Sequence, residues 1–119
     1  MVYMQLTTER PPLTPAVFHI LLALATTDRH GYDIMKRVES DSEGSVKMGP
    51  GTLYGSIKRM LSDGFIEESG ERPDPSLDDT RRKYYRITPL GRKLLSVEIE
   101  RMSHVMNIAR RLKLNSSQT

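Results

Sequence analysis

The sequence predicts a mainly α-helical domain that carries one small β-hairpin. Three observations predict it: an almost wholly apolar helix near the N-terminus, an amphipathic helix that leads directly into a strand, and a long amphipathic segment at the C-terminus. Helices followed by a strand hairpin are the arrangement of a winged helix-turn-helix. We therefore expect an α+β winged helix-turn-helix with a long C-terminal dimerisation helix.

The amphipathic segment 48–66, MGPGTLYGSIKRMLSDGFI, is the centre of this prediction. At the helical repeat, apolar side chains fall on one side and small, hydroxyl-bearing or cationic side chains on the other. Gly55 lies on the polar side, where a glycine costs about 0.5–1 kcal/mol relative to alanine. A bare backbone there favours close approach to a partner. Asp63 and Gly64 then end the helix, and Phe65 begins a strand.

Two further helices are expected before this segment. Thr14 as N-cap and Pro15 at the first helical position start the first, which is apolar almost all round and should be the central core helix. Residues 26–31 predict a short turn, and a second helix follows over about 32–39. The turn-rich linker 40–51 includes a minor strand at 45–47.

The wing is predicted from two runs of strand-forming residues. The first strand covers 65–68, and the second covers 81–88, with sequence RRKYYRIT. Between them, residues 69–80 contain two prolines, a glycine and several acids, which is typical of a mobile loop. Because those acids would be repelled by phosphate, we do not expect this loop to insert deeply into a minor groove.

The C-terminal segment predicts a helix from Pro89 to about residue 114, with Thr88 as its N-cap. Its apolar residues form two sides, and a helix of about 25 residues, roughly 37 Å long, cannot bury two sides against so small a domain. A second copy of the chain is the expected cover. The expected dimer interface comprises Phe18, Leu22, Leu95, Ile99, Met102, Val105, Met106, Ala109 and Leu112.

The expected organisation is a flexible arm over 1–12, a winged-helix domain over 13–88, a dimerisation helix over 89–114 and a disordered tail over 115–119. The 119 residues include no cysteine, which excludes disulfides, and no run of about 20 apolar residues that would span a bilayer. We expect a cytoplasmic protein. The net charge of +3 is too weak to indicate nucleic-acid binding by itself.

Four segments in this order resemble the PadR family of bacterial transcription regulators: LTPAVFHILLALA, HGYDIMKRV, GPGTLYGSIKRMLSDGFIEE and RKYYRITPLGRKLL. The resemblance covers about residues 13–95. It implies a homodimeric winged helix-turn-helix that represses by occupying an operator, often with a small effector releasing it. The short chain with one C-terminal helix is similar to the compact branch of that family.

Double-stranded DNA is the expected partner, because the third helix offers free amides, hydroxyls and cations on one face. Lys58 and Arg59 are the best placed for bases or backbone, and Tyr54 either bonds a phosphate or packs against the wing. Cations at the base of the wing would lie over the sugar-phosphate backbone. The expected DNA-binding residues are Lys36, Ser45, Lys47, Gly51, Thr52, Tyr54, Gly55, Ser56, Lys58, Arg59, Arg81, Arg82 and Lys83.

No catalytic arrangement, metal site or cofactor is expected. The three histidines lie in separate segments without metal-ligand spacing. Met102 and Met106 are interpreted as interface packing, with an apolar effector pocket as the alternative. The predicted function is a homodimeric repressor that binds an inverted-repeat operator. The rival hypothesis is a winged-helix module that binds a protein partner instead of DNA.

Overall fold

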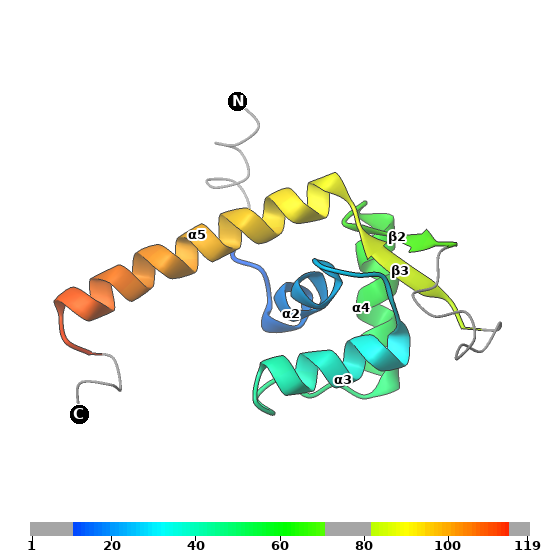
Figure 1. The fold of residues 1–119 in the computed structure, drawn as a ribbon, viewed down its shortest axis with the longest axis horizontal. Coiled ribbons are helices and arrows are strands. Elements are labelled where there is room, and N and C mark those ends of the chain that lie inside the picture. The colour runs from blue at the N-terminus through cyan, green and yellow to red at the C-terminus, as the bar shows by residue number, and fades with distance from the viewer. Residues whose placement is uncertain (1–10, 71–81, 115–119) are drawn as a thin grey trace.

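The structure, a computed structural model, describes residues 11–70 and 82–114 and has the predicted α+β winged-helix fold (Figure 1). A three-stranded antiparallel sheet of order β1-β3-β2 lies beside the helices, with the hairpin β2–β3 forming the wing. The elements in chain order are α2 (Pro15–Leu24), β1 (Arg29–His30), α3 (Gly31–Asp41), α4 (Pro50–Ser62), β2 (Ile66–Ser69), β3 (Tyr84–Ile87) and α5 (Pro89–Arg111).

The predicted starts of two helices are confirmed. The Thr14 hydroxyl accepts a hydrogen bond from the Val17 amide at 3.2 Å, and Pro15 occupies the first helical position. Thr88 caps α5 in the same way, accepting from the Gly91 amide at 3.1 Å. Each hydroxyl satisfies an amide that has no partner within its helix, so both helix starts are set by a Thr-Pro pair.

The predicted end of α4 at Asp63 and Gly64 is also confirmed. Gly64 has φ +80°, and its amide bonds the Leu61 carbonyl at 3.2 Å. The next amide, of Phe65, bonds the Met60 carbonyl at 2.9 Å, which completes a Schellman motif. Because the positive φ favours glycine, this turn directs the chain from α4 straight into β2.

The strands differ from the prediction in three respects. Residues 29–30, expected in a turn, form β1 because they pair with Tyr84 and Tyr85 of β3. No strand is present at 45–47 within the described part of the chain. In the described residues, β3 covers only 84–87, and both Tyr84 and Tyr85 are buried.

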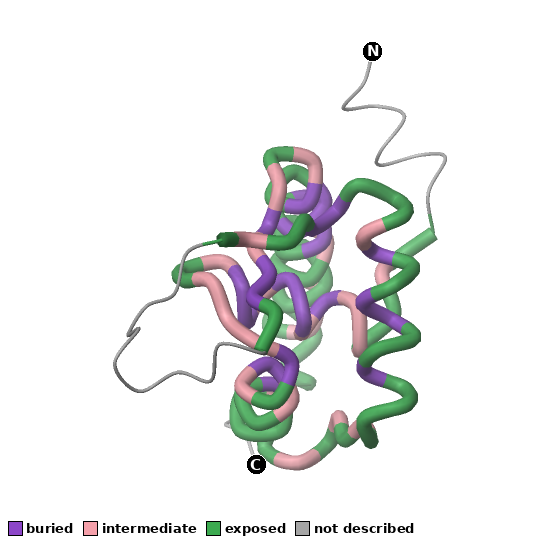
Figure 2. Tube along the Cα trace, turned by 90° about the vertical axis from the view of Figure 1, so that its right-hand side faces the viewer, coloured by how far each residue is buried: buried purple, intermediate pink, exposed green. Residues whose placement is uncertain are grey.

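Helix α2 is the centre of the core, as predicted. Ile20 and Leu21 are fully buried, and α2 contacts α3, α4, α5 and β3. From α4 the buried side chains are Leu53, Ile57 and Met60, and buried and exposed positions alternate along this helix (Figure 2). The predicted core face of α4 is therefore confirmed, with Leu61 partly buried at its edge.

Helix α5 divides into two parts. Its first half packs on the domain through Leu94, Leu95 and Val97. A Cβ at Gly91 would stand 2.9 Å from Ile87 Cγ1 and would collide with the Phe65 carbonyl, so a glycine is needed where α5 begins beside the end of β3. The second half extends away from the domain (Figure 1). Of the helices described, none combines the length and the apolar character required to cross a membrane.

Candidate nucleic-acid interface

The outer face of α4 carries most of the residues predicted to bind DNA. Thr52, Tyr54, Gly55, Lys58 and Arg59 are all exposed on it. This face combines a hydroxyl, a phenol and two cations on one rigid helix. Such groups suit the phosphates and base edges of a major groove, which admits one α-helix.

Ser56 does not belong to this face. Only 3% of it is exposed, so its side chain is not available to a partner. The prediction failed because Ser56 lies three residues after Leu53, less than one turn further on, and so falls at the margin of the core side. Ser56 was predicted to bind DNA, but in the structure it belongs to the buried side of α4.

The two glycines at the exposed side of α4 are not required by the fold. A Cβ built at Gly51 or Gly55 would meet nothing within 4 Å. Gly55 therefore weakens the helix by about 0.5–1 kcal/mol without any packing constraint within the described structure. The described structure therefore leaves open space beside this glycine.

The start of α4 leaves amides facing outward. The N-cap is Gly49, which has no side chain to accept a hydrogen bond from the first turn. Gly51 and Thr52 follow in that turn and are exposed. Because the first amides of a helix have no acceptor within it, they are suited to bind an anion, as the sequence predicted for this position.

Tyr54 packs on the start of α3 rather than on the outside of the wing. A Cβ at Gly31 would lie 2.7 Å from Tyr54 Cζ and would overlap the hydroxyl, so the ring rests directly over this glycine. Even so, Tyr54 remains 49% exposed. The ring therefore packs within the chain while part of it stays accessible to a partner.

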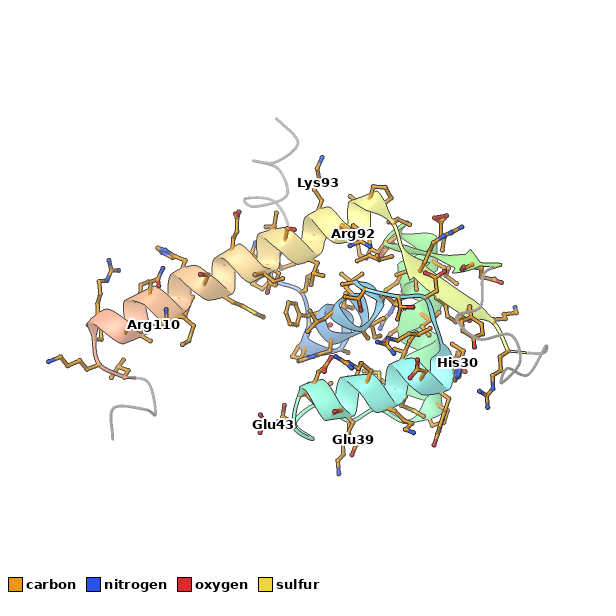
Figure 3. All side chains as sticks on the ribbon, viewed as in Figure 1. His30, Glu39, Glu43, Arg92, Lys93 and Arg110 are labelled. Carbon is orange, nitrogen blue, oxygen red and sulfur yellow. The ribbon has the colours of Figure 1, made fainter. Side chains whose placement is uncertain are left out.

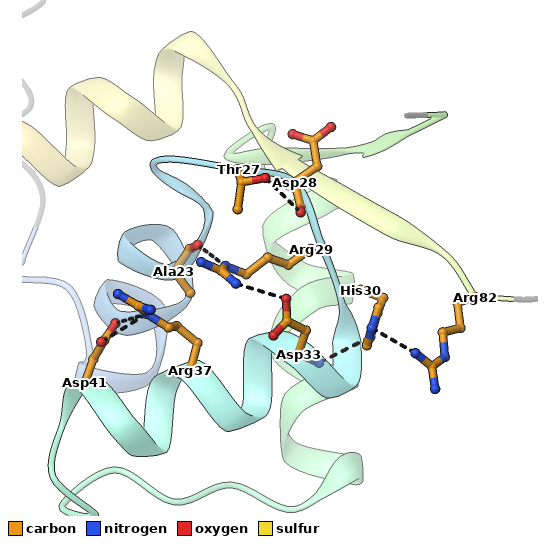
Figure 4. A network of polar contacts seen from close by, with 9 residues as sticks. All are labelled: Ala23, Thr27, Asp28, Arg29, His30, Asp33, Arg37, Asp41 and Arg82. Carbon is orange, nitrogen blue, oxygen red and sulfur yellow. Dashed lines mark hydrogen bonds and ion pairs between the residues drawn. The ribbon is translucent and has the colours of Figure 1, made fainter. Parts of the chain in front are cut away.

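The base of the wing supplies two exposed cations, Arg82 and Lys83, just before β3. The Arg82 guanidinium lies 3.0 Å from His30 Nε2 (Figure 4). With Tyr54, these residues line a cavity of about 350 Å³ whose other lining residues are His30, Gly31, Tyr32 and Tyr85. Arg81, also predicted to bind DNA, lies outside the described residues, as do the acids Glu71, Asp74, Asp78 and Asp79.

Three predicted DNA-binding residues lie outside α4 and the wing, and each has a partner within the chain. The Ser45 hydroxyl donates to the Ser42 carbonyl at 2.8 Å, and Lys47 lies 3.9 Å from Glu39. Lys36 lies over the Tyr32 ring, 5.5 Å from its centroid. Both lysines are exposed, and such surface contacts are weak, so their side chains remain free to reorient toward a phosphate.

Sequence reasoning missed the polar network that fixes the start of α3 (Figure 4). Arg29 donates to the Ala23 carbonyl at 2.7 Å and to the Asp33 carboxylate at 3.0 Å, which joins the end of α2 to α3. His30 caps α3 by accepting from the Asp33 amide at 3.2 Å. Histidine is not among the common N-cap residues, so the sequence carried little signal for this role.

The predicted dimer residues fall into two groups. Phe18 and Leu95 are buried in the core of a single chain, and Leu22 and Ala109 are partly buried. The other five are exposed large apolar side chains, of which all but Leu112 lie within α5: Ile99, Met102, Val105, Met106 and Leu112. The second group forms an apolar surface that one chain does not cover, and we call it the α5 apolar face.

Within the described residues, no three histidine, aspartate or glutamate side chains are close enough to hold a metal ion.

Residues 20–97 match the model of the family described as "Transcriptional regulator PadR-like family". The chain belongs to this family. A relative from Lysinibacillus sphaericus, named only as an uncharacterized protein X, is 34% identical over 89 residues, which are 75% of this chain and 79% of the relative. PadR-like proteins are transcriptional regulators rather than enzymes.

Solved structures place the PadR-like chain among regulators of the same fold. A transcriptional regulator from Clostridium thermocellum is 27% identical, with a TM-score of 0.63 over 81% of this chain and 87% of that one. PadR from Bacillus subtilis, solved in complex with operator DNA, is 21% identical with a TM-score of 0.56. That match covers 67% of this chain and 44% of the longer PadR chain.

Proposed function

We propose that this PadR-like protein is a homodimeric, cytoplasmic repressor that binds an inverted-repeat operator in double-stranded DNA. The observation that carries the proposal is the outer face of α4, where Lys58 and Arg59 flank a glycine that the fold does not require. The residues proposed to contact DNA are Lys36, Lys47, Gly51, Thr52, Tyr54, Gly55, Lys58, Arg59, Arg82 and Lys83, with Ser45 and Arg81 as outer contacts.

The family and the operator complex of Bacillus subtilis PadR support DNA as the partner. In the proposed complex α4 enters the major groove, and Gly55 lets the backbone of this helix approach the base edges closely. The cations at the base of the wing then lie over the adjoining sugar-phosphate backbone. Residues 13–88 form the DNA-binding domain.

The α5 apolar face supports the homodimer. Ile99, Met102, Val105 and Met106 are 42–57% exposed, and each lies three or four residues from another of them, on one side of the helix. Packing this face on the same face of a second chain would bury it and relate the two α4 helices by a two-fold axis. The half-sites would then lie about 34 Å apart, one turn of DNA.

The same face offers a place for a small effector. A cavity of about 460 Å³ is lined by Glu98, Arg101, Met102, Val105 and Met106. Methionine side chains adapt to different apolar ligands, and Glu98 forms an ion pair with Arg101 at the edge. A ligand held there would alter the packing of the two α5 helices, and with it the separation of the two α4 helices.

Selection from a random duplex library, followed by fluorescence anisotropy at two salt concentrations, tests the proposal. We expect the selected sites to be inverted repeats, and we expect affinity to fall steeply with salt because several phosphates are neutralised. Equal weak binding to every duplex, or no binding at low salt, would instead favour a winged-helix module that binds a protein.

A further inference from the structure

A cavity of about 350 Å³ lies beside α4. It brings together the start of α3, Tyr54 from α4, and Arg82, Lys83 and Tyr85 from the wing. We propose that this cavity binds one phosphate of the DNA backbone, and that His30 positions Arg82 to receive it. The inference rests on the proposed function, because DNA supplies the phosphate.

The charge of the cavity favours an anion. Among its described lining residues are two cations, Arg82 and Lys83, and no carboxylate. Arginine and lysine form strong charge-assisted hydrogen bonds with phosphate oxygens, and two cations on one cavity wall repel each other until an anion lies between them. The anion therefore relieves a repulsion as well as making new bonds.

Tyr85 adds a hydroxyl to the cavity. Only 5% of this residue is exposed, and it lines the cavity. Burial, then the nearby Glu68 carboxylate and Tyr54, raise the pKa of Tyr85, so at neutral pH the hydroxyl keeps its proton and can donate. A phosphate oxygen in the cavity would accept a hydrogen bond from this hydroxyl.

His30 lies between two donors. Its Nδ1 is 3.2 Å from the Asp33 amide, and its Nε2 is 3.0 Å from Arg82 Nη1 (Figure 4). A neutral imidazole has one acceptor nitrogen, so it accepts from one of these donors at a time. When Nε2 is the acceptor, the ring orients the Arg82 guanidinium, whose other N–H groups can donate to a phosphate oxygen.

The position of the cavity identifies the source of the phosphate. Tyr54 belongs to the exposed side of α4 and also lines the cavity, and its ring rests on Gly31. When α4 lies in a major groove, the backbone at the edge of that groove runs past Tyr54 toward the wing. A backbone phosphate would therefore reach the cavity in the same complex in which Lys58 and Arg59 reach the groove.

Phosphate-by-phosphate neutralisation of a selected duplex tests the proposal. Each duplex carries one methylphosphonate, which removes the charge of a single phosphate. For the unmodified protein we expect one position in each half-site where this weakens binding by at least about fivefold. Arg82→Gln should bind less tightly overall but lose sensitivity at that position alone. Lys93→Gln is the matched control, since Lys93 points away from the domain on the outer side of α5 (Figure 3).

The substitution His30→Asn separates the positioning of Arg82 from the capping of α3. Asparagine is a preferred N-cap residue, so α3 should keep its cap and the protein should unfold at the same temperature. The variant should nevertheless lose sensitivity at the same phosphate as Arg82→Gln, because Arg82 is no longer held. Full sensitivity in His30→Asn would overturn the positioning role, and full sensitivity in Arg82→Gln would overturn the phosphate site.

Titration with inorganic phosphate distinguishes a free anion from DNA. One outcome would assign the cavity to a free anion and overturn the DNA assignment. In that outcome the NMR signals of the Gly31 and Tyr32 amides shift when phosphate is added, but Arg82→Gln changes the sensitivity to no single methylphosphonate in the duplex. If the library yields no bound duplex at all, the proposed function itself fails. A duplex that binds but shows no such position contradicts only the inference.

Discussion

The ring of Tyr54 rests on the bare backbone of Gly31, which joins the outer side of α4 to the first turn of α3. Gly31 is buried, whereas Tyr54 remains about half exposed and is not fixed by the hydrophobic core. The contact instead holds the phenol beside Arg82 and Lys83 at the edge of the proposed DNA surface. The glycine is therefore explained by the Tyr54 ring, which fills the space that a Cβ would need.

Gly31→Ala should reduce DNA affinity while changing stability little. The new methyl would displace Tyr54, and an exposed side chain at the end of flexible bonds can swing outward cheaply, so we expect the free energy of unfolding to change by less than about 1 kcal/mol. DNA affinity should fall, because the phenol leaves the cavity. Thermal unfolding and anisotropy with a selected duplex would measure the two effects.

A double-mutant cycle provides the control for Gly31. In a Tyr54→Ala background, Gly31→Ala should cause no additional loss of affinity, since no ring remains to be displaced. Additive losses would refute the contact as the reason for the glycine. Gly91→Ala provides the contrast, because its methyl would meet the Phe65 carbonyl and overpacking of this kind costs about 1–3 kcal/mol of stability.

Gly55→Ala should move stability and binding in opposite directions. Alanine favours the helix by about 0.5–1 kcal/mol, and its methyl has open space in the free protein. Against DNA the methyl would prevent close approach, at a cost of about 1–3 kcal/mol, or roughly 5- to 150-fold in Kd. Thermal unfolding and anisotropy on the same preparation check both signs. Unchanged affinity in the more stable variant would remove Gly55 from the interface.

Local chemistry explains which parts of the fold the sequence could predict. Thr14 and Thr88 were identified as N-caps because each precedes a proline, and Gly64 was identified because a positive φ favours glycine. These signals involve neighbouring residues only. The exposed positions of Lys58 and Arg59 likewise followed from the helical repeat of one segment.

Features that depend on distant contacts could not be predicted in this way. β1 has two residues, too few for a periodic pattern, and it exists because Arg29 and His30 pair with β3 more than 50 residues later. The cavity was missed for the same reason, since it joins three segments. The helical repeat places Ser56 near the boundary between the buried and exposed sides of α4. Only the packing around Ser56 determines that it is buried.

Lys58→Ala and Arg59→Ala should each weaken operator binding with little effect on folding. Both side chains are exposed, and surface substitutions usually change stability by no more than about 0.5 kcal/mol. A residue that contacts a base should lose about 1–3 kcal/mol for one base pair and relax specificity there, whereas a phosphate contact should reduce binding to all sequences and lower the salt slope by about one. Unaltered operator affinity in both variants would contradict the assignment of α4 as the recognition helix.

Ile99→Gln combined with Met106→Gln should convert the proposed dimer into a monomer. These residues are 45% and 42% exposed in one chain, so replacing them leaves the domain core intact. In a dimer the same changes would bury two amides per chain without assured partners, which is unfavourable. Sedimentation should therefore detect monomers, and binding to an inverted repeat should fall because the two half-sites are no longer bound together.

Glu100→Gln is the control that should remain dimeric. Glu100 is one residue further along α5 than Ile99, so its side chain is turned about 100° away from that of Ile99. Dimers that persist in the double variant would show that the α5 apolar face is not the interface, and would direct the search to α2 and its partly buried Leu22.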